Sequence, residues 1–255
     1  MKPLRYLMIF FGVATLAFGL GFVFQLPAVT GVWPWPDGRL SYLFVGSIFA
    51  AISAAALWIG WSGEFAALAA GTLNVLITAT ATCVYFFMLA LQAGRNNLLP
   101  IALGALLAAL AGGGAFLWSR RLSLRDDRPM PALVRISFWI FVISLVIVGG
   151  LLVLRKQVFP WDLNPDSSIV FGWIFLGDAS YFAWGLTRPR WHNAAGQLLS
   201  FLAYDLVLIL PFLRLFQTVD PGRLFSLTAY VVILIYSGAL AAYFLLIASQ
   251  TRLRA

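Results

Sequence analysis

Long apolar intervals alternate with short polar segments along the chain. Six intervals contain no charged residue, namely 6–36, 40–63, 65–94, 96–119, 136–154 and 224–251. Two further intervals, 167–187 and 191–213, contain a single aspartate each. An α-helix rises about 1.5 Å per residue, so about 20 apolar residues cross a hydrocarbon core roughly 30 Å thick. Every one of these intervals is therefore long enough for one helix that crosses a membrane.

The pattern predicts an all-α fold, a polytopic transmembrane bundle of about eight helices. The expected helices span residues 4–26, 41–62, 65–89, 98–119, 134–154, 168–187, 194–216 and 224–247. Helices are favoured over the strands of a β-barrel because the apolar runs are continuous and do not alternate with polar residues. The first run is longer than the roughly 7–15 residues of a signal-peptide core, so we expect it to be retained as a helix.

Composition supports a lipid environment and narrows the possible chemistry. Of the 255 residues, 62% are hydrophobic and only 10% are charged, whereas a soluble domain carries about 25% charged residues. The single cysteine, Cys83, excludes an intramolecular disulfide, and the single histidine, His192, excludes paired haem ligation and histidine-rich metal sites. The chain contains neither a phosphate-binding loop motif nor a nucleophile elbow. We therefore expect no cofactor and no metal.

Lysine and arginine positions predict the orientation in the membrane. With the N-terminus inside, the inner segments hold eleven basic residues: Lys2, Arg5, Arg120, Arg121, Arg125, Arg128, Arg135, Arg188, Arg190, Arg252 and Arg254. The outer segments hold six: Arg39, Arg95, Arg155, Lys156, Arg214 and Arg223. Basic residues concentrate in cytoplasmic loops, so both termini are expected to be cytoplasmic. The net charge of +8 is expected to face the headgroups of the lipid bilayer, because no soluble basic domain is present to bind nucleic acid.

The two halves of the chain share a motif of aromatic residues and proline. Trp-Pro-Trp-Pro-Asp at 33–37 precedes the second expected helix, and Phe-Pro-Trp-Asp at 159–162 precedes the sixth. A shift of 126 residues aligns Trp35 with Trp161, Gly46 with Gly172, Ile48 with Ile174, Phe49 with Phe175 and Trp58 with Trp184. The tryptophans of these loops are expected to anchor the chain at the outer membrane interface.

This alignment predicts an internal repeat. We expect two parallel four-helix repeats, residues 1–122 and 130–255, joined by a cytoplasmic linker at 123–129. The aromatic-proline loop followed by a helix with an early glycine resembles a pattern in uncharacterised bacterial integral membrane proteins. The resemblance covers the loop before the second helix of each half. It implies a multi-pass protein of the cell inner (plasma) membrane, and it brings no activity with it.

Two intramembrane acids are the strongest candidates for a functional site. Asp178 and Asp205 lie 13 and 14 residues from the expected turn near residue 191, so both are expected near the bilayer midplane. An ionised aspartate there costs at least about 2.5–3.5 kcal/mol, and such residues usually face the bundle interior. The expected ligand- or proton-binding residues are Asp178, Asp205, Asn74, Tyr181 and Gln197, and we expect Asn74, Tyr181 and the two aspartates to line one pocket. The alternative is that each aspartate simply joins two helices through a hydrogen bond.

Three functions agree with these features. The first is a transporter or carrier of a small molecule or proton with a carboxylate site at the midplane. The second is an intramembrane enzyme that modifies lipids with two carboxylates as acid and base; here the Gly177-Asp178 pair is similar to one in the membrane lysoplasmalogenase family. The third is a non-catalytic subunit of a membrane complex. Glu64, at the start of the third expected helix, is expected to cap it, and His192 is expected in a cytoplasmic loop.

Overall fold

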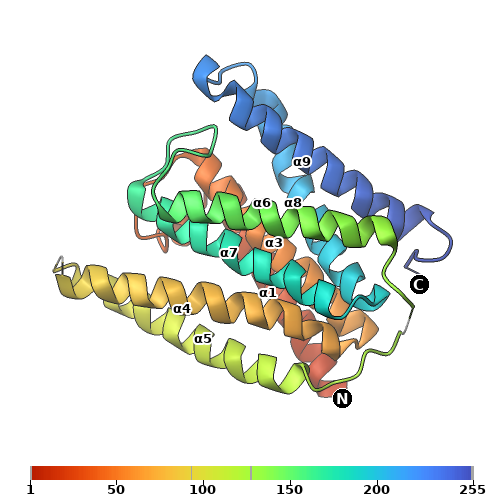
Figure 1. Cartoon of the computed structure of the whole chain (residues 1–255). Coiled ribbons are helices and arrows are strands. Elements are labelled where there is room, and N and C mark those ends of the chain that lie inside the picture. Colours follow the sequence, from red (N-terminus) through yellow and green to blue (C-terminus); the bar gives the residue numbers. More distant parts are fainter. Residues whose placement is uncertain (1, 93, 127, 254–255) are drawn as a thin grey trace. The chain divides into compact units, whose positions relative to one another are not determined.

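The computed structural model describes residues 2–92, 94–126 and 128–253. Its long helices are α1 (Lys2–Val23), α3 (Arg39–Ser62), α4 (Leu68–Gln92), α5 (Leu99–Ser119), α6 (Ala132–Val153), α7 (Pro165–Thr187), α8 (Trp191–Leu215) and α9 (Leu224–Ala242) (Figure 1). Within the described residues, eight helical segments are long and apolar enough to cross a membrane. The predicted helical bundle is therefore confirmed. Arg254, expected in the cytoplasm, and Asp127 of the expected linker lie outside the described residues.

Short helical turns that the apolar pattern does not predict join or extend the long helices. They are α2 (Pro27–Thr30), the 3-10 turns Phe65–Ala67, Asn96–Leu98 and Pro221–Arg223, and a π-turn at Tyr243–Ile247 that continues α9. Two of these turns start at a proline, whose missing N–H and fixed φ suit the first position of a helix. They are local features of the loops and leave the eight long helices in place.

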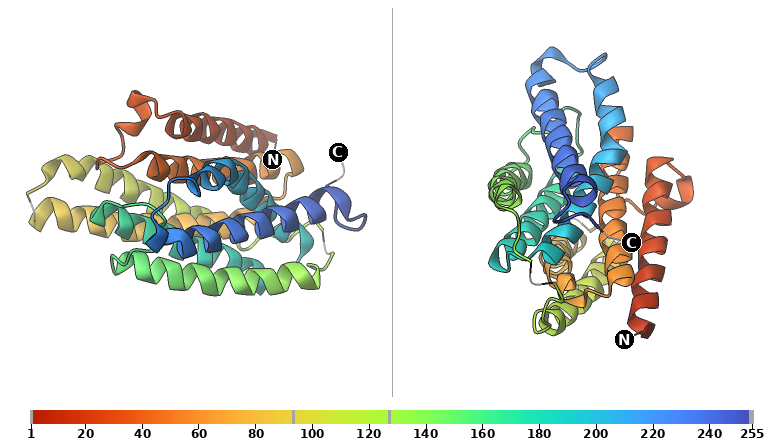
Figure 2. Two further views of the ribbon diagram at one scale, coloured as in Figure 1. Left: turned by 90° about the horizontal axis from the view of Figure 1, so that it is seen from above. Right: turned by 90° about the vertical axis from the view of Figure 1, so that its right-hand side faces the viewer.

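The helices form two compact units. Unit 1 comprises the chain up to Glu64, the segment Gln157–Asn164 and the chain from Trp191 on; unit 2 comprises Phe65–Lys156 and Pro165–Arg190. In unit 1, α3 packs against both α1 and α8, and α8 packs against α9. In unit 2, α4 packs against both α5 and α7, and α7 packs against α6. The α4–α5 pair lies side by side in both views of Figure 2.

Each unit contains two helices from each half of the sequence. The contacts therefore group the helices differently from the expected halves 1–122 and 130–255, because α3 packs against α8 and α4 packs against α7. The order of the helices in the chain does not predict these two pairs, because helices pack where the side chains on their surfaces fit together. The repeat itself concerns sequence similarity and stays a prediction.

Glycines bring helices α1 and α3 of unit 1 into close contact. A Cβ atom added to Gly46 would lie 2.9 Å from the carbonyl oxygen of Gly19, and one added to Gly19 would lie 3.0 Å from that of Gly46. Real Cβ atoms do not approach a backbone oxygen so closely without displacement. Small residues allow such approach and are common where transmembrane helices cross.

Unit 2 contains a crossing of the same kind between α6 and α7. A Cβ atom on Gly172 would lie 2.7 Å from the carbonyl oxygen of Gly149, and one on Gly149 would lie 2.9 Å from that of Gly172. The residues aligned by the sequence, Gly46 and Gly172, thus occupy matching positions in two different helix pairs. In each pair the absence of a side chain is what permits the helix contact.

The aromatic loops pack inside unit 1. Trp35 and Trp161 are each only 7% exposed. The Trp161 ring stacks on Phe159 with centroids 4.3 Å apart, and its Nε1 donates a hydrogen bond of 3.1 Å to Ser41 Oγ. For these two tryptophans the expectation of an anchor at the membrane interface is wrong, because burial against protein satisfies both the ring and, for Trp161, its N–H group.

Candidate functional site

The most deeply buried acid of a membrane-spanning helix in unit 1 is Asp205. It lies on α8 facing α9 and is 4% exposed. Ser237 Oγ on α9 lies 2.9 Å from Asp205 Oδ2. The other carboxyl oxygen, Oδ1, is buried and has no hydrogen-bond partner among the described residues. Gly238 lies against the carboxyl, and a Cβ there would meet Oδ2 at 3.4 Å, an ordinary van der Waals distance.

Ser237 has a second acceptor on its own helix. Its Oγ also lies 2.7 Å from the carbonyl oxygen of Ile233, one turn earlier on α9. A serine hydroxyl has a single hydrogen, so it cannot fully satisfy both oxygens. The hydroxyl donates to both Asp205 Oδ2 and the Ile233 carbonyl oxygen, which share its one hydrogen. The carboxyl of Asp205 is therefore only partly satisfied, because Oδ1 has no partner among the described residues.

A buried polar face leads along α8 to this carboxyl. It consists of Asn193, Gln197, Ser200 and Asp205, all buried and spaced by three to five residues. Asn193, Gln197 and Ser200 lie on one side of the helix, and Asp205 lies about 80° around the axis from Gln197. The 12 positions from Asn193 to Asp205 correspond to a rise of about 18 Å. Next to Asp205, the hydroxyl of Tyr204 contacts that of Tyr230 on α9. Gln197, an expected site residue, is buried on the same helix about two turns before Asp205.

In unit 2, Asp178 joins α7 to α4. Asn74 Nδ2 donates a hydrogen bond of 2.7 Å to Asp178 Oδ1. Thr78 Oγ1 lies 3.0 Å from Asn74 Oδ1 and 3.2 Å from the carbonyl oxygen of Trp173. A Cβ atom on Gly177 would overlap both Asn74 Oδ1 and Thr78 Oγ1. The lack of a side chain at Gly177 therefore allows this polar contact between the helices.

The structure divides the five expected site residues into two groups. Asn74, Asp178 and Tyr181 belong to unit 2, and Gln197 and Asp205 belong to unit 1. Asn74 meets Asp178 directly, whereas buried Tyr181 lies against α4, where a Cβ on Gly71 would be 3.9 Å from its ring. Each aspartate has a side-chain partner in its own unit, as the bundle-joining alternative expects. A single pocket that contains both aspartates stays a prediction.

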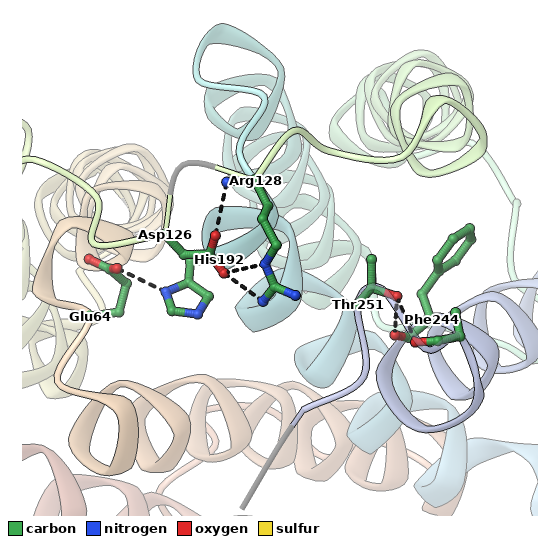
Figure 3. Close-up of polar contacts among 7 residues, drawn as sticks. Glu64, Asp126, Arg128, His192, Phe244 and Thr251 are labelled. Carbon is green, nitrogen blue, oxygen red and sulfur yellow. Dashed lines mark hydrogen bonds and ion pairs between the residues drawn. The ribbon is translucent and has the colours of Figure 1, made fainter.

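A second carboxyl site in unit 1 was not expected from the sequence. Glu64 is 1% exposed, and its Oε2 lies 3.1 Å from His192 Nδ1 at the start of α8 (Figure 3). The His192 ring also packs on Trp58 in a T-shaped arrangement, with centroids 5.7 Å apart. The expectation that Glu64 serves only as a helix cap is therefore incomplete.

The local backbone explains how Glu64 becomes buried. Gly63 ends α3 in a left-handed conformation, with φ of 71°, and turns the chain sharply. Glu64 follows this turn and precedes the 3-10 turn Phe65–Ala67. The sequence contained one usable signal, since Glu64 is the only charge between Arg39 and Arg95 and His192 is the only histidine. Their pairing depends on the packing of α3 against α8, which the sequence did not indicate.

Neither a metal-binding cluster nor a known relative identifies the site. Within residues 2–92, 94–126 and 128–253, no three side chains of histidine, cysteine, aspartate or glutamate are grouped closely enough to hold a metal ion. No protein family, curated protein or solved structure matches the chain. The functional conclusion therefore depends on the geometry of the residues themselves.

Proposed function

We propose that the chain is a multi-pass carrier of the bacterial inner membrane whose transport cycle binds and releases a proton at Asp205. The observation that supports this proposal is a buried carboxyl in a membrane-spanning helix with one oxygen that lacks a partner among the described residues. Ionisable residues inside a membrane are costly and are typical of proton relays and ion pathways. Entry of water beside Asp205 would stabilise the carboxylate and release the proton.

The polar face of α8 supplies the groups that such a path requires. Asn193, Gln197 and Ser200 present amide and hydroxyl groups between the start of the helix and Asp205. All three side chains are buried in the protein, and a buried polar group costs free energy unless it is hydrogen bonded. Water molecules between these groups would complete a chain of hydrogen bonds to the carboxyl.

The duplicated frame is part of the proposal. Matching glycine crossings at Gly46 and Gly172 support two parallel repeats that each contribute helices to both compact units. Substrate sites of repeat-built carriers lie near the midplane where repeats meet. One residue later in register, a shift of 125 aligns Gly71 with Gly196 and Thr80 with Asp205, so the first half has no acid at this position. The excess of basic residues in alternate loops supports cytoplasmic termini.

Proton coupling can be tested in vesicles that contain the purified protein and a pH-sensitive dye. Gradients of glucose, glycine, choline and magnesium ions are imposed one at a time, each representing a class of solute. We expect at least one gradient to change the internal pH, and Asp205→Asn to abolish the change. Asp220→Asn is the matched control, because Asp220 caps a short turn and asparagine caps equally well.

Two results would contradict the proposal. One is an internal pH that responds to none of the four solutes, and the other is a proton flux that is the same in wild type and Asp205→Asn. Infrared spectroscopy supplies an independent readout. The carbonyl absorption of a neutral carboxylic acid should be present in the wild type and lose intensity in Asp205→Asn, since the proposal places the bound proton on this side chain.

A further inference from the structure

A large apolar groove lies on unit 2. Its volume is about 650 Å³, and it is formed by α4, the end of α6 and the first half of α7. The lining is mostly hydrocarbon, with Leu76, Val84 and Met88 of α4 facing Val153 and Ile169. Pockets of about 300–1,000 Å³ are typical of small-ligand sites. Water gains no hydrogen bonds from such a lining, so the occupant must itself be apolar over most of its length.

The dimensions of the groove match one leaflet of a bilayer. Its α4 residues run from Leu76, near the middle of that helix, to Met88, near its end. Twelve residues of α-helix correspond to about 18 Å, and half of a hydrocarbon core is about 15 Å. The groove therefore has the length of a single acyl chain that extends from the midplane to the membrane surface.

A charged cluster stands at the surface end of the groove. Asp166, at the start of α7, accepts hydrogen bonds from Tyr85 Oη at 2.7 Å and from Arg95 Nη1 at 2.8 Å. Arg155 Nη2 lies 3.4 Å from the same carboxylate and 3.5 Å from Tyr85 Oη. Tyr85 also lines the groove, so the cluster and the apolar lining are continuous. Two arginines against one aspartate leave an excess of one positive charge.

The two guanidinium groups retain donors for an external anion. The side chains of Arg95 and Arg155 are 48% and 53% exposed. Each guanidinium has five N–H donors, and the contacts among the described residues use one nitrogen of each. Arginine matches the oxygens of a phosphate in a bidentate manner. We propose that this groove binds an anionic phospholipid, with one acyl chain along α4 and the phosphate on Arg95 and Arg155.

The proposal can be tested by native mass spectrometry of the protein in a neutral detergent. The probes are phosphatidylglycerol, phosphatidylcholine with the same acyl chains, and glycerol phosphate, which is the headgroup without chains. We expect phosphatidylglycerol to bind at least about tenfold more tightly than phosphatidylcholine, because only the former has a net negative charge. Glycerol phosphate should not compete at the same concentration, because it cannot fill the apolar groove.

Variants separate the two parts of the site. Arg95→Gln with Arg155→Gln should reduce phosphatidylglycerol binding about tenfold. Arg121→Gln, at an exposed turn residue after the C-terminal end of α5, should leave it unchanged. Ala81→Phe narrows the groove and leaves every contact of the charged cluster in place, so it should also weaken binding. This second variant keeps the test valid when the double arginine variant does not fold.

Three outcomes would overturn the proposal. Equal affinity for the two lipids would remove the role of the positive charge. Effective competition by glycerol phosphate would indicate a site for a free phosphate ester. Unchanged phosphatidylglycerol binding in Ala81→Phe would show that the lipid lies elsewhere on the protein.

Discussion

Gln25 and Arg155 end α1 and α6 in the same unusual backbone conformation. Their φ angles are 53° and 55°, and they are the two non-glycine residues with positive φ in the described part of the chain. After each helix the next N–H group bonds back five residues, from Leu26 to Gly21 and from Lys156 to Leu151. This is the Schellman ending, which usually has glycine at the left-handed position. The shared ending supports the proposed duplication in helices that lack visible sequence similarity.

The left-handed conformation predicts a stabilising substitution at Gln25. Glycine adopts positive φ without the steric cost that a side chain imposes, so Gln25→Gly should raise the free energy of unfolding by about 0.5–1 kcal/mol. Thermal unfolding in detergent measures the change. Gln25→Ala is the control, because alanine retains the strain. A melting temperature that falls equally in both variants would contradict this explanation.

The crossing of α6 and α7 predicts opposite effects at two neighbouring glycines. A Cβ on Gly149 would lie 2.9 Å from the backbone oxygen of Gly172, whereas one on Gly150 would have nothing within 4 Å. Gly149→Ala should therefore destabilise the protein by about 1–3 kcal/mol through overpacking. Gly150→Ala should be neutral or stabilise it by up to about 1 kcal/mol through helix propensity. Comparable melting temperatures for the two variants would argue against the tight crossing.

The contact between α4 and α7 predicts a pH-dependent variant. Asn74→Asp replaces the amide that donates to Asp178 with a second carboxyl at the same distance of 2.7 Å. Two carboxylates so close cannot both be ionised, so the variant should melt at a lower temperature at neutral pH and recover partly in acid. Asn97→Asp, at an exposed position before α5, is the matched control. Similar pH profiles for the two variants would exclude a direct contact between residues 74 and 178.

The apolar pattern predicted the helices well because membrane thickness determines their length. The expected second helix, 41–62, matches α3 at Arg39–Ser62, and the expected fifth, 134–154, matches α6 at Ala132–Val153. The apolar pattern did not predict which helices pack against each other. The close approach of Gly149 to Gly172 shows why, since it depends on where two helices meet and not on the apolar content of either.

The candidate site was predictable only in its residue types. Asp178 and Asn74 were expected to lie together and do so, because both acids and amides inside a membrane require a polar partner. The partner of Asp205 was not expected, since Ser237 is one of many serines in apolar helices. Glu64 likewise reads as a helix-capping acid until the packing of α3 on α8 places it beside His192.

The Glu64–His192 contact predicts a measurable coupling between the two side chains. Because Glu64 is 1% exposed, removing His192 takes away a hydrogen-bond partner that water cannot easily replace, so His192→Ala should cost about 1–3 kcal/mol. Glu64→Ala removes the same hydrogen bond by deleting its other partner. The double variant should therefore be less destabilised than the sum of the single variants, with a coupling energy of about 0.5–3 kcal/mol.

The control for this cycle must retain the packing of the imidazole on Trp58. His192→Phe keeps an aromatic ring and removes the nitrogen that faces Glu64, so it should show most of the destabilisation of His192→Ala if the hydrogen bond is responsible. Melting temperatures of the single and double variants in one detergent provide the comparison. Strict additivity of Glu64→Ala and His192→Phe would mean that the two side chains contribute independently, and the buried glutamate would then depend on its other contacts for stability.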